Sequence, residues 1–131
     1  MDIVKYIADH LEDKNPVDSD GWTPLHFAAQ EGHLDIVKFI SPYLDNKNPI
    51  DNENEKWTPL HSAAEEGYLE IVKFIGDHLE DKSPFNVQKW TPLHLAAKKG
   101  HFEIVKFLAD FSENKNPSNT DGDTPLSLAQ G

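Results

Sequence analysis

The chain has 131 residues, no cysteine, and a formal net charge of −11 from 12 Lys and Arg against 23 Asp and Glu. This charge argues against binding to nucleic acid or to an anionic membrane, because both need a basic field, and the lack of cysteine excludes disulfides and Cys-ligated zinc. The first residues are charged throughout and no apolar run approaches ~18 residues, so we expect neither a signal peptide nor a membrane span, and a cytoplasmic protein.

The predicted elements are short helices. The first covers IVKYIADHL, residues 3–11, and the next lies in TPLHFAAQEG, where Thr23 is a suitable N-cap, Pro24 fits the first turn and Gly32 fits the left-handed position that ends a helix. A second helix follows in HLDIVKFISPYL, with apolar residues at helical spacing, and should run back antiparallel. Because helices below ~12–15 residues are marginal in water, each pair must pack on its neighbours.

This helix pair recurs along the chain. The TPL motif begins at Thr23, Thr58, Thr91 and Thr124, at spacings of 35, 33 and 33 residues, and the two extra residues lie in the connection before Thr58. A fixed period of this size indicates stacked supersecondary units. We predict a single domain, 1–131, with a half unit that has only a second helix (1–17), three repeats (18–52, 53–85 and 86–118) and a half unit that has only a first helix (119–131).

The period of 33 and the copies TPLHFAA, TPLHSAA and TPLHLAA resemble the ankyrin repeat family, whose signature is T-P-L-H-x-A. The resemblance covers nearly the whole chain. It implies an all-α ankyrin-repeat solenoid of stacked antiparallel helix pairs with projecting β-hairpin-like fingers. It also implies a protein–protein interaction scaffold that binds a partner protein on the concave face formed by fingers and first helices.

Two features depart from the family pattern. The glycine that usually ends the second helix is absent, so we expect this helix or a following turn to extend further, with Leu11, Leu44 and Leu79 packed inward, until an NP or SP step stops it. Pro42 would remove a helical hydrogen bond and clash with the preceding turn, so we expect a break near Ser41.

Three histidines share one place in successive units, namely His26, His61 and His94. Successive copies should lie ~8–10 Å apart, which is too far for one zinc ion with Zn–N bonds of ~2.0–2.1 Å. We therefore predict half-buried imidazoles that hydrogen-bond to the backbone of the neighbouring finger.

The remaining histidines are predicted to be structural or solvent-facing. His33 and His101, with Tyr68 as the equivalent residue, should support the turn into the second helix, while His10 and His78 should face solvent. No Ser/His/Asp order, Gly-rich phosphate loop or paired acid motif stands outside the repeats. We predict no enzyme, no cofactor and no metal.

Residues that the fold does not need are the candidates for partner binding. A tryptophan fills the slot before TPL in three units, where each ring either covers its own finger and the adjacent one or offers an aromatic binding stripe. The exposed end of the first helix reads QE, then EE, then KK. This is either solvated surface or a code for a partner that is basic opposite the middle units and acidic opposite the last one. The predicted partner-binding residues are Ser19, Asp20, Trp22, Gln30, Glu31, Asn54, Glu55, Trp57, Glu65, Glu66, Val87, Gln88, Trp90, Lys98 and Lys99.

Two further alternatives stay open. One is a designed or purely structural solenoid without a cognate partner, although Pro42 and the two-residue insertion are untypical of idealised design. The other is head-to-tail self-association through the half-unit ends, in which the apolar residues Ile3 and Ile7 of one copy would complete the unit of Leu126 and Leu128 in another. The alternative to self-association is that the half units mark a fragment boundary with frayed ends.

Overall fold

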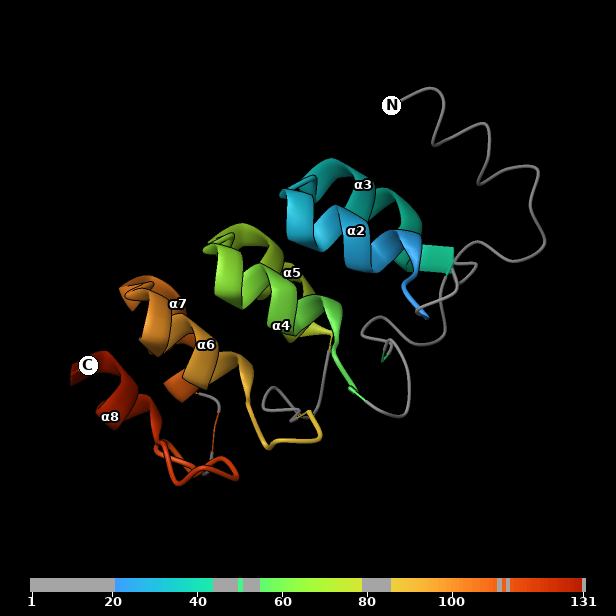
Figure 1. The fold of residues 1–131 in the computed structure, drawn as a ribbon. Helices are drawn as coiled ribbons and strands as arrows, with labels where there is room; N and C mark the ends of the chain where they lie inside the picture. Colours follow the sequence, from blue (N-terminus) through green and yellow to red (C-terminus); the bar gives the residue numbers. More distant parts are fainter. Residues whose placement is uncertain are drawn as a thin grey trace.

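A computed structural model describes residues 21–43, 50, 55–78, 86–110, 112 and 114–130, and all regular structure within these ranges is helical (Figure 1). The elements are α2 (Pro24–Glu31), α3 (Leu34–Ile40), the 3-10 helix η1 (Ser41–Tyr43), α4 (Pro59–Glu66), α5 (Leu69–Asp77), α6 (Pro92–Lys99), α7 (Phe102–Asp110) and α8 (Pro125–Gln130).

The TPLH motif begins each of the helices α2, α4 and α6 in the same way. In α4, the Thr58 side chain accepts a hydrogen bond from the backbone N–H of His61, and the His61 imidazole caps the backbone N–H of Thr58 in return. Pro59 follows at the first helical position, where its missing N–H costs nothing. Gly67 ends the helix with a φ of 87°, a left-handed conformation that only glycine adopts readily. The predicted N-cap, proline and glycine stop are confirmed.

The helix pairs stack in two rows. The first helices α2, α4, α6 and α8 pack in series, and the second helices α3, α5 and α7 lie beside them in the same order (Figure 1). The core between the rows is built by Leu25, Leu60 and Leu93 from the first helices and by Ile71 and Ile104 from the second. The all-α solenoid is therefore confirmed. Each described pair lies within one predicted unit, and the unit limits stay a prediction.

Pro42 shortens α3, the first described helix of the second row. α3 ends at Ile40 and continues as the 3-10 helix Ser41–Tyr43, whereas α5 runs on to Asp77, the equivalent of Pro42. The Ser41 hydroxyl donates to the Val37 carbonyl at 2.7 Å, which stabilises the chain at the break. The predicted break near Ser41 is confirmed.

The expected extension of the second helix, or of a turn after it, stays a prediction, because residues 44–49 and 79–85 lie outside the described residues. α5 ends at Asp77, with His78 as its C-cap. The three leucines named for this extension, at positions 11, 44 and 79, lie outside the described residues.

The connections between units form hairpin-like fingers. In the third unit, the Asn86 N–H donates to the Trp90 carbonyl at 3.0 Å, and the Asn86 side-chain oxygen accepts from the N–H groups of Gln88 and Trp90. Neighbouring fingertips are joined by Val87 N–H to the Glu55 carbonyl at 3.3 Å and by Thr120 N–H to the Gln88 carbonyl at 2.9 Å. These bonds hold the fingers in register along the array.

Candidate functional site

A row of buried imidazoles ties each unit to the next. His26, His61 and His94 are all 0% exposed, and their Nε2 atoms lie 3.0, 2.9 and 3.1 Å from the carbonyl oxygens of Trp57, Trp90 and Asp123. Since Nδ1 accepts from the threonine N–H, Nε2 carries the proton and donates to the carbonyl. The predicted bond to the neighbouring finger is confirmed. The prediction of half-buried rings was wrong, because the next unit covers each ring completely.

Burial lowers the pKa of His94, although the carbonyls of Asp123 and Pro117 and the Asp123 carboxylate oppose the shift. The neutral ring is therefore favoured in the folded state. Between the lowered pKa and the ordinary value of about 6.5, the unfolded chain binds more protons, so stability rises with pH in this window.

We therefore expect the free energy of unfolding to fall as the pH is lowered from about 6.5 toward the lowered pKa of His94, and to fall less in His94→Gln, which has no imidazole at this position. Urea titrations at several pH values measure both slopes. Identical slopes in the two proteins would show that His94 is not linked to folding.

The residues at the start of the second helices also reach the preceding unit. His101 Nε2 donates to the Glu65 carbonyl at 2.9 Å, and the Tyr68 ring lies against Gly32, so closely that a methyl group there would meet it at 2.8 Å. Neither His33 nor Tyr68 makes a side-chain cap to its own helix. For Tyr68 and His101, the expectation that they support the turn into their own second helix is corrected, because stacking places both rings over the helix end of the preceding unit. For His33 it stays a prediction.

The other two histidines were expected to face solvent. His78 is exposed, with its Nδ1 2.7 Å from the Phe74 carbonyl, which confirms the expectation for this residue. His10 lies outside the described residues.

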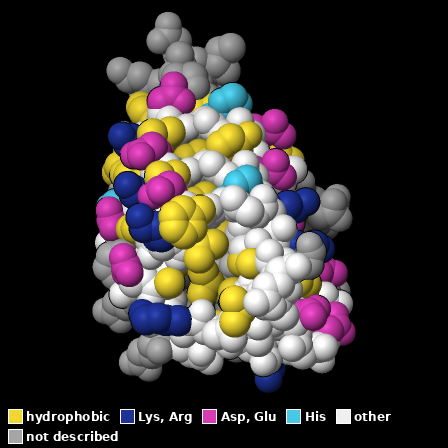
Figure 2. All heavy atoms as spheres, turned by 90° about the vertical axis from the view of Figure 1, so that its left-hand side faces the viewer, with side chains coloured by type: hydrophobic (Ala, Val, Ile, Leu, Met, Phe, Trp, Pro, Cys, Tyr) yellow, Lys and Arg dark blue, Asp and Glu magenta, His cyan; other side chains and the backbone are white. Residues whose placement is uncertain are grey.

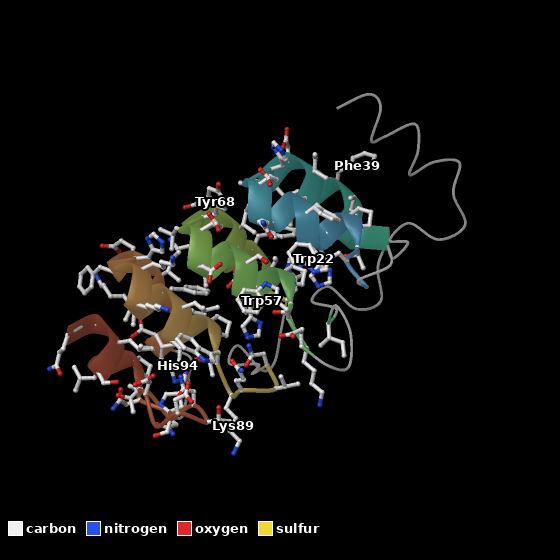
Figure 3. All side chains as sticks on the ribbon, in the orientation of Figure 1. Trp22, Phe39, Trp57, Tyr68, Lys89 and His94 are labelled. Atoms are coloured by element: carbon white, nitrogen blue, oxygen red, sulfur yellow. The ribbon has the colours of Figure 1, made fainter. Side chains whose placement is uncertain are left out.

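Six of the predicted partner-binding residues converge on one hollow. Its volume is about 270 Å³. It lies between the first and second described units and is lined by the tryptophans of both units, labelled in Figure 3, and by residues near the ends of α2 and α4. We call it the Trp hollow. Its lining residues are Trp22, Gln30, Glu55, Trp57, Ser62, Glu65 and Glu66.

The tryptophans are held by their own units. The Trp57 ring lies 5.0 Å from the His61 ring, and its Nε1 donates to the Ser62 hydroxyl at 2.7 Å. Trp22 lies 5.1 Å from His26. Both indoles are half-buried. One part of each indole therefore packs on the imidazole of its own unit and another part lines the Trp hollow. The aromatic binding stripe stays a prediction.

The tryptophan of the third unit has different surroundings from those of the first two units. Trp90 does not line the Trp hollow, and the Lys98 ammonium lies 5.3 Å from the centre of its ring. Val87 and Gln88 are exposed at the fingertip, and Lys99 is exposed at the end of α6.

Four predicted residues remain apart from these groups. Glu31 is exposed at the end of α2 and does not line the Trp hollow. Ser19, Asp20 and Asn54 lie outside the described residues.

Two residues that face this surface were not predicted. Both follow the TPLH motif: Ser62 lines the Trp hollow, and Phe27 is 49% exposed with its ring 5.1 Å from Trp22. The signal was present, because this position reads Phe, Ser, Leu and Leu in the four copies, while the residues around it are nearly constant.

The end of the array at α7 and α8 is apolar. Phe102 and Leu126 are 67% and 59% exposed, and they border a cavity of about 320 Å³ that Leu93, Val105 and Ala129 also line. Figure 2 shows hydrophobic side chains gathered at the middle of this end.

Two classes of site find no support in the described part of the chain. No three His, Asp or Glu side chains among these residues are grouped as metal ligands would be. As for membranes, each helix in the described ranges is too short or too polar to cross a bilayer.

Helix pairs of constant period, stacked with their fingers in register, define a solenoid repeat protein. A family model for ankyrin repeats in three copies matches residues 1–86 and 77–131, so the chain belongs to the ankyrin repeat family. Among curated proteins, no significant relative was found. Ankyrin repeats are generally protein–protein interaction modules.

Proposed function

We propose that this protein is a non-enzymatic interaction scaffold whose partner protein binds the face formed by the fingers and the first helices, with the Trp hollow at its centre. The carrying observation is the convergence of six predicted residues on one hollow of about 270 Å³. We propose no cofactor and neither nucleic acid nor membrane as partner. The cytoplasmic location stays a prediction from the sequence.

The side chains of this face contribute little to the core. Gln30 and Glu66 are exposed and Glu65 is half-buried, whereas the neighbouring Ala29 and Ala64 are 0% exposed. Polar residues that a helix does not need for packing are free to serve recognition. Tryptophan is the residue most enriched in interface hot spots. Trp57 lines the hollow between the first and second described units, so a partner that spans these two units would have Trp57 near the centre of its interface.

Trp57→Ala is expected to weaken binding of such a partner by about 2 kcal/mol or more, whereas Lys73→Ala, an exposed change on α5, should change it by less than about 0.5 kcal/mol. Quantitative capture from cell lysate with both variants and the parent chain measures the effect. Equal losses would remove the assignment of this face.

Stability has to be separated from binding in this test, because Trp57 also packs on His61 and bonds Ser62. Glu66→Arg and Glu70→Arg provide a matched pair, since both residues are exposed on adjacent helices and both changes alter the charge equally. A partner of the proposed face should be lost with Glu66→Arg alone. If no captured protein distinguishes the two variants, the alternative of a purely structural solenoid stands.

Self-association is a second candidate, favoured by the apolar end at α7 and α8. Within the array, Gly32 and Gly67 are covered by the rings of Tyr68 and His101, but no described atom comes near the equivalent position at Gly100. The segment IVKYIADHL, residues 3–11, closely matches IVKFLADF, residues 104–111, in which Ile104 and Leu108 are buried. The N-terminal segment of a second copy is therefore our proposed occupant, although it lies outside the described residues.

If two copies join in this way, the mass measured by sedimentation should rise with concentration for the parent chain. Phe102→Asp should abolish the rise, because it places a charge in an apolar junction. Phe27→Asp, the same change at an exposed residue of α2, should leave it unaltered. A strict monomer at high concentration would overturn this candidate.

A further inference from the structure

The third unit holds a cation over its tryptophan. Lys98 follows Trp90 by eight residues, and its ammonium lies 5.3 Å from the centre of that ring. The residue eight positions after Trp57 is Glu65, and the one eight positions after Trp22 is Gln30. The same slot of the repeat thus carries a positive charge in one unit and a negative or neutral group in the two units that form the Trp hollow.

The chemistry of the Trp hollow complements a cation. Two indole rings line it together with the residues Glu55, Glu65 and Glu66, and the face of an indole attracts an ammonium group through the ring quadrupole. Among the described residues, neither the Glu65 nor the Glu66 carboxylate forms an ion pair. A partner's cation would therefore find negative charge that the described chain does not neutralise.

The size of the Trp hollow fits a single side chain. Its volume of about 270 Å³ is below the ~300–1,000 Å³ typical of pockets for drug-sized ligands. A lysine brings an apolar stem that packs along aromatic surface and a charged end that meets the carboxylates.

We propose that the Trp hollow binds the side chain of a lysine of the partner protein, with its ammonium group between the indoles of Trp22 and Trp57 and the carboxylates of Glu55, Glu65 and Glu66. This inference rests on the proposed function and names the chemistry that the face recognises. Within this chain, Lys98 over Trp90 is an intramolecular version of the same contact.

The chain contains three tryptophans, so three indole N–H signals in a proton–nitrogen correlation spectrum report on the two environments separately. The probe is Nα-acetyl-lysine methylamide, and the control is its norleucine counterpart, which keeps the stem and lacks the ammonium. The lysine probe should shift the Trp22 and Trp57 signals in a saturable manner and leave Trp90 unchanged, because Lys98 already covers that ring. Signals are assigned with single Trp→Phe variants.

Glu65→Lys supplies the decisive variant, since it places in the second unit the residue type that covers Trp90 in the third. It should weaken the lysine probe at least tenfold, whereas Glu70→Lys, with the same change of charge at an exposed residue of α5, should weaken it less than twofold. Equal shifts with the norleucine probe, equal shifts at Trp90, or equal losses in both variants would each overturn the lysine site.

This experiment uses purified protein and no partner, so it fails or succeeds independently of the capture experiment. Capture that depends on Glu66 without any lysine-specific shift would leave the interaction face standing and remove the lysine site.

Discussion

His61→Ala is expected to lower the free energy of unfolding by about 3 kcal/mol, as measured by urea titration followed by circular dichroism. The imidazole is 0% exposed, and its removal leaves a cavity whose cost adds to the lost contacts. It also strands the Thr58 N–H, which donates to Nδ1 at 3.3 Å, and it removes the bond from Nε2 to the Trp90 carbonyl at 2.9 Å that joins two units. A buried polar group left without a partner costs about 1–3 kcal/mol.

His78→Ala is the matched control. This histidine is exposed at the end of α5, and its loss should change stability by no more than about 0.5 kcal/mol. If His61→Ala cost as little as His78→Ala, the imidazole row would not be what joins the units. Zinc or EDTA should leave the unfolding curve of the parent chain unchanged, since we assign the imidazoles to backbone carbonyls.

Gly67→Ala is expected to destabilise the protein by about 3 kcal/mol, against about 1 kcal/mol for Gly100→Ala. Both glycines are left-handed, with φ of 87° and 77°, which costs an L-residue about 1–2 kcal/mol. They differ in their surroundings, because a Cβ at Gly67 would lie 2.7 Å from Cε1 of the His101 ring, while no described atom lies within 4 Å at Gly100. The ring cannot withdraw without giving up its bond to the Glu65 carbonyl.

The difference between these two variants measures the contact between units and cancels the backbone strain that they share. Thermal and urea unfolding of both proteins give the comparison. Losses of the same size would mean that His101 moves aside at no cost, and that the stacking of helix ends does not contribute to the stability of the array.

Stability and recognition share residues in this array. The Trp90 backbone carbonyl accepts the bond that joins two units, while its side chain faces Lys98. Trp57 has the same double role, with its carbonyl bonded to His26 and its ring lining the Trp hollow. Charge changes at Glu65 and Glu66 therefore test recognition more cleanly than changes at the tryptophans.

The sequence by itself determined the local structure. Thr58, Pro59 and Gly67 start and stop a helix through bonds and dihedral angles that span only a few residues, and the period of the TPLH motif implies that the same helix recurs and stacks. Pro42 was likewise predicted to break its helix, because the clash with the preceding turn depends on local geometry alone.

Only the tertiary structure decided what the units do to one another. The full burial of His61, the reach of His101 to the Glu65 carbonyl and the meeting of Trp22 with Trp57 around one hollow depend on how closely successive units stack. These residues lie more than 25 positions apart in the chain, where helix propensity and capping rules give no distances. The sequence could name the residues that the fold leaves free, but the packing of neighbouring helices selected which of them share a site.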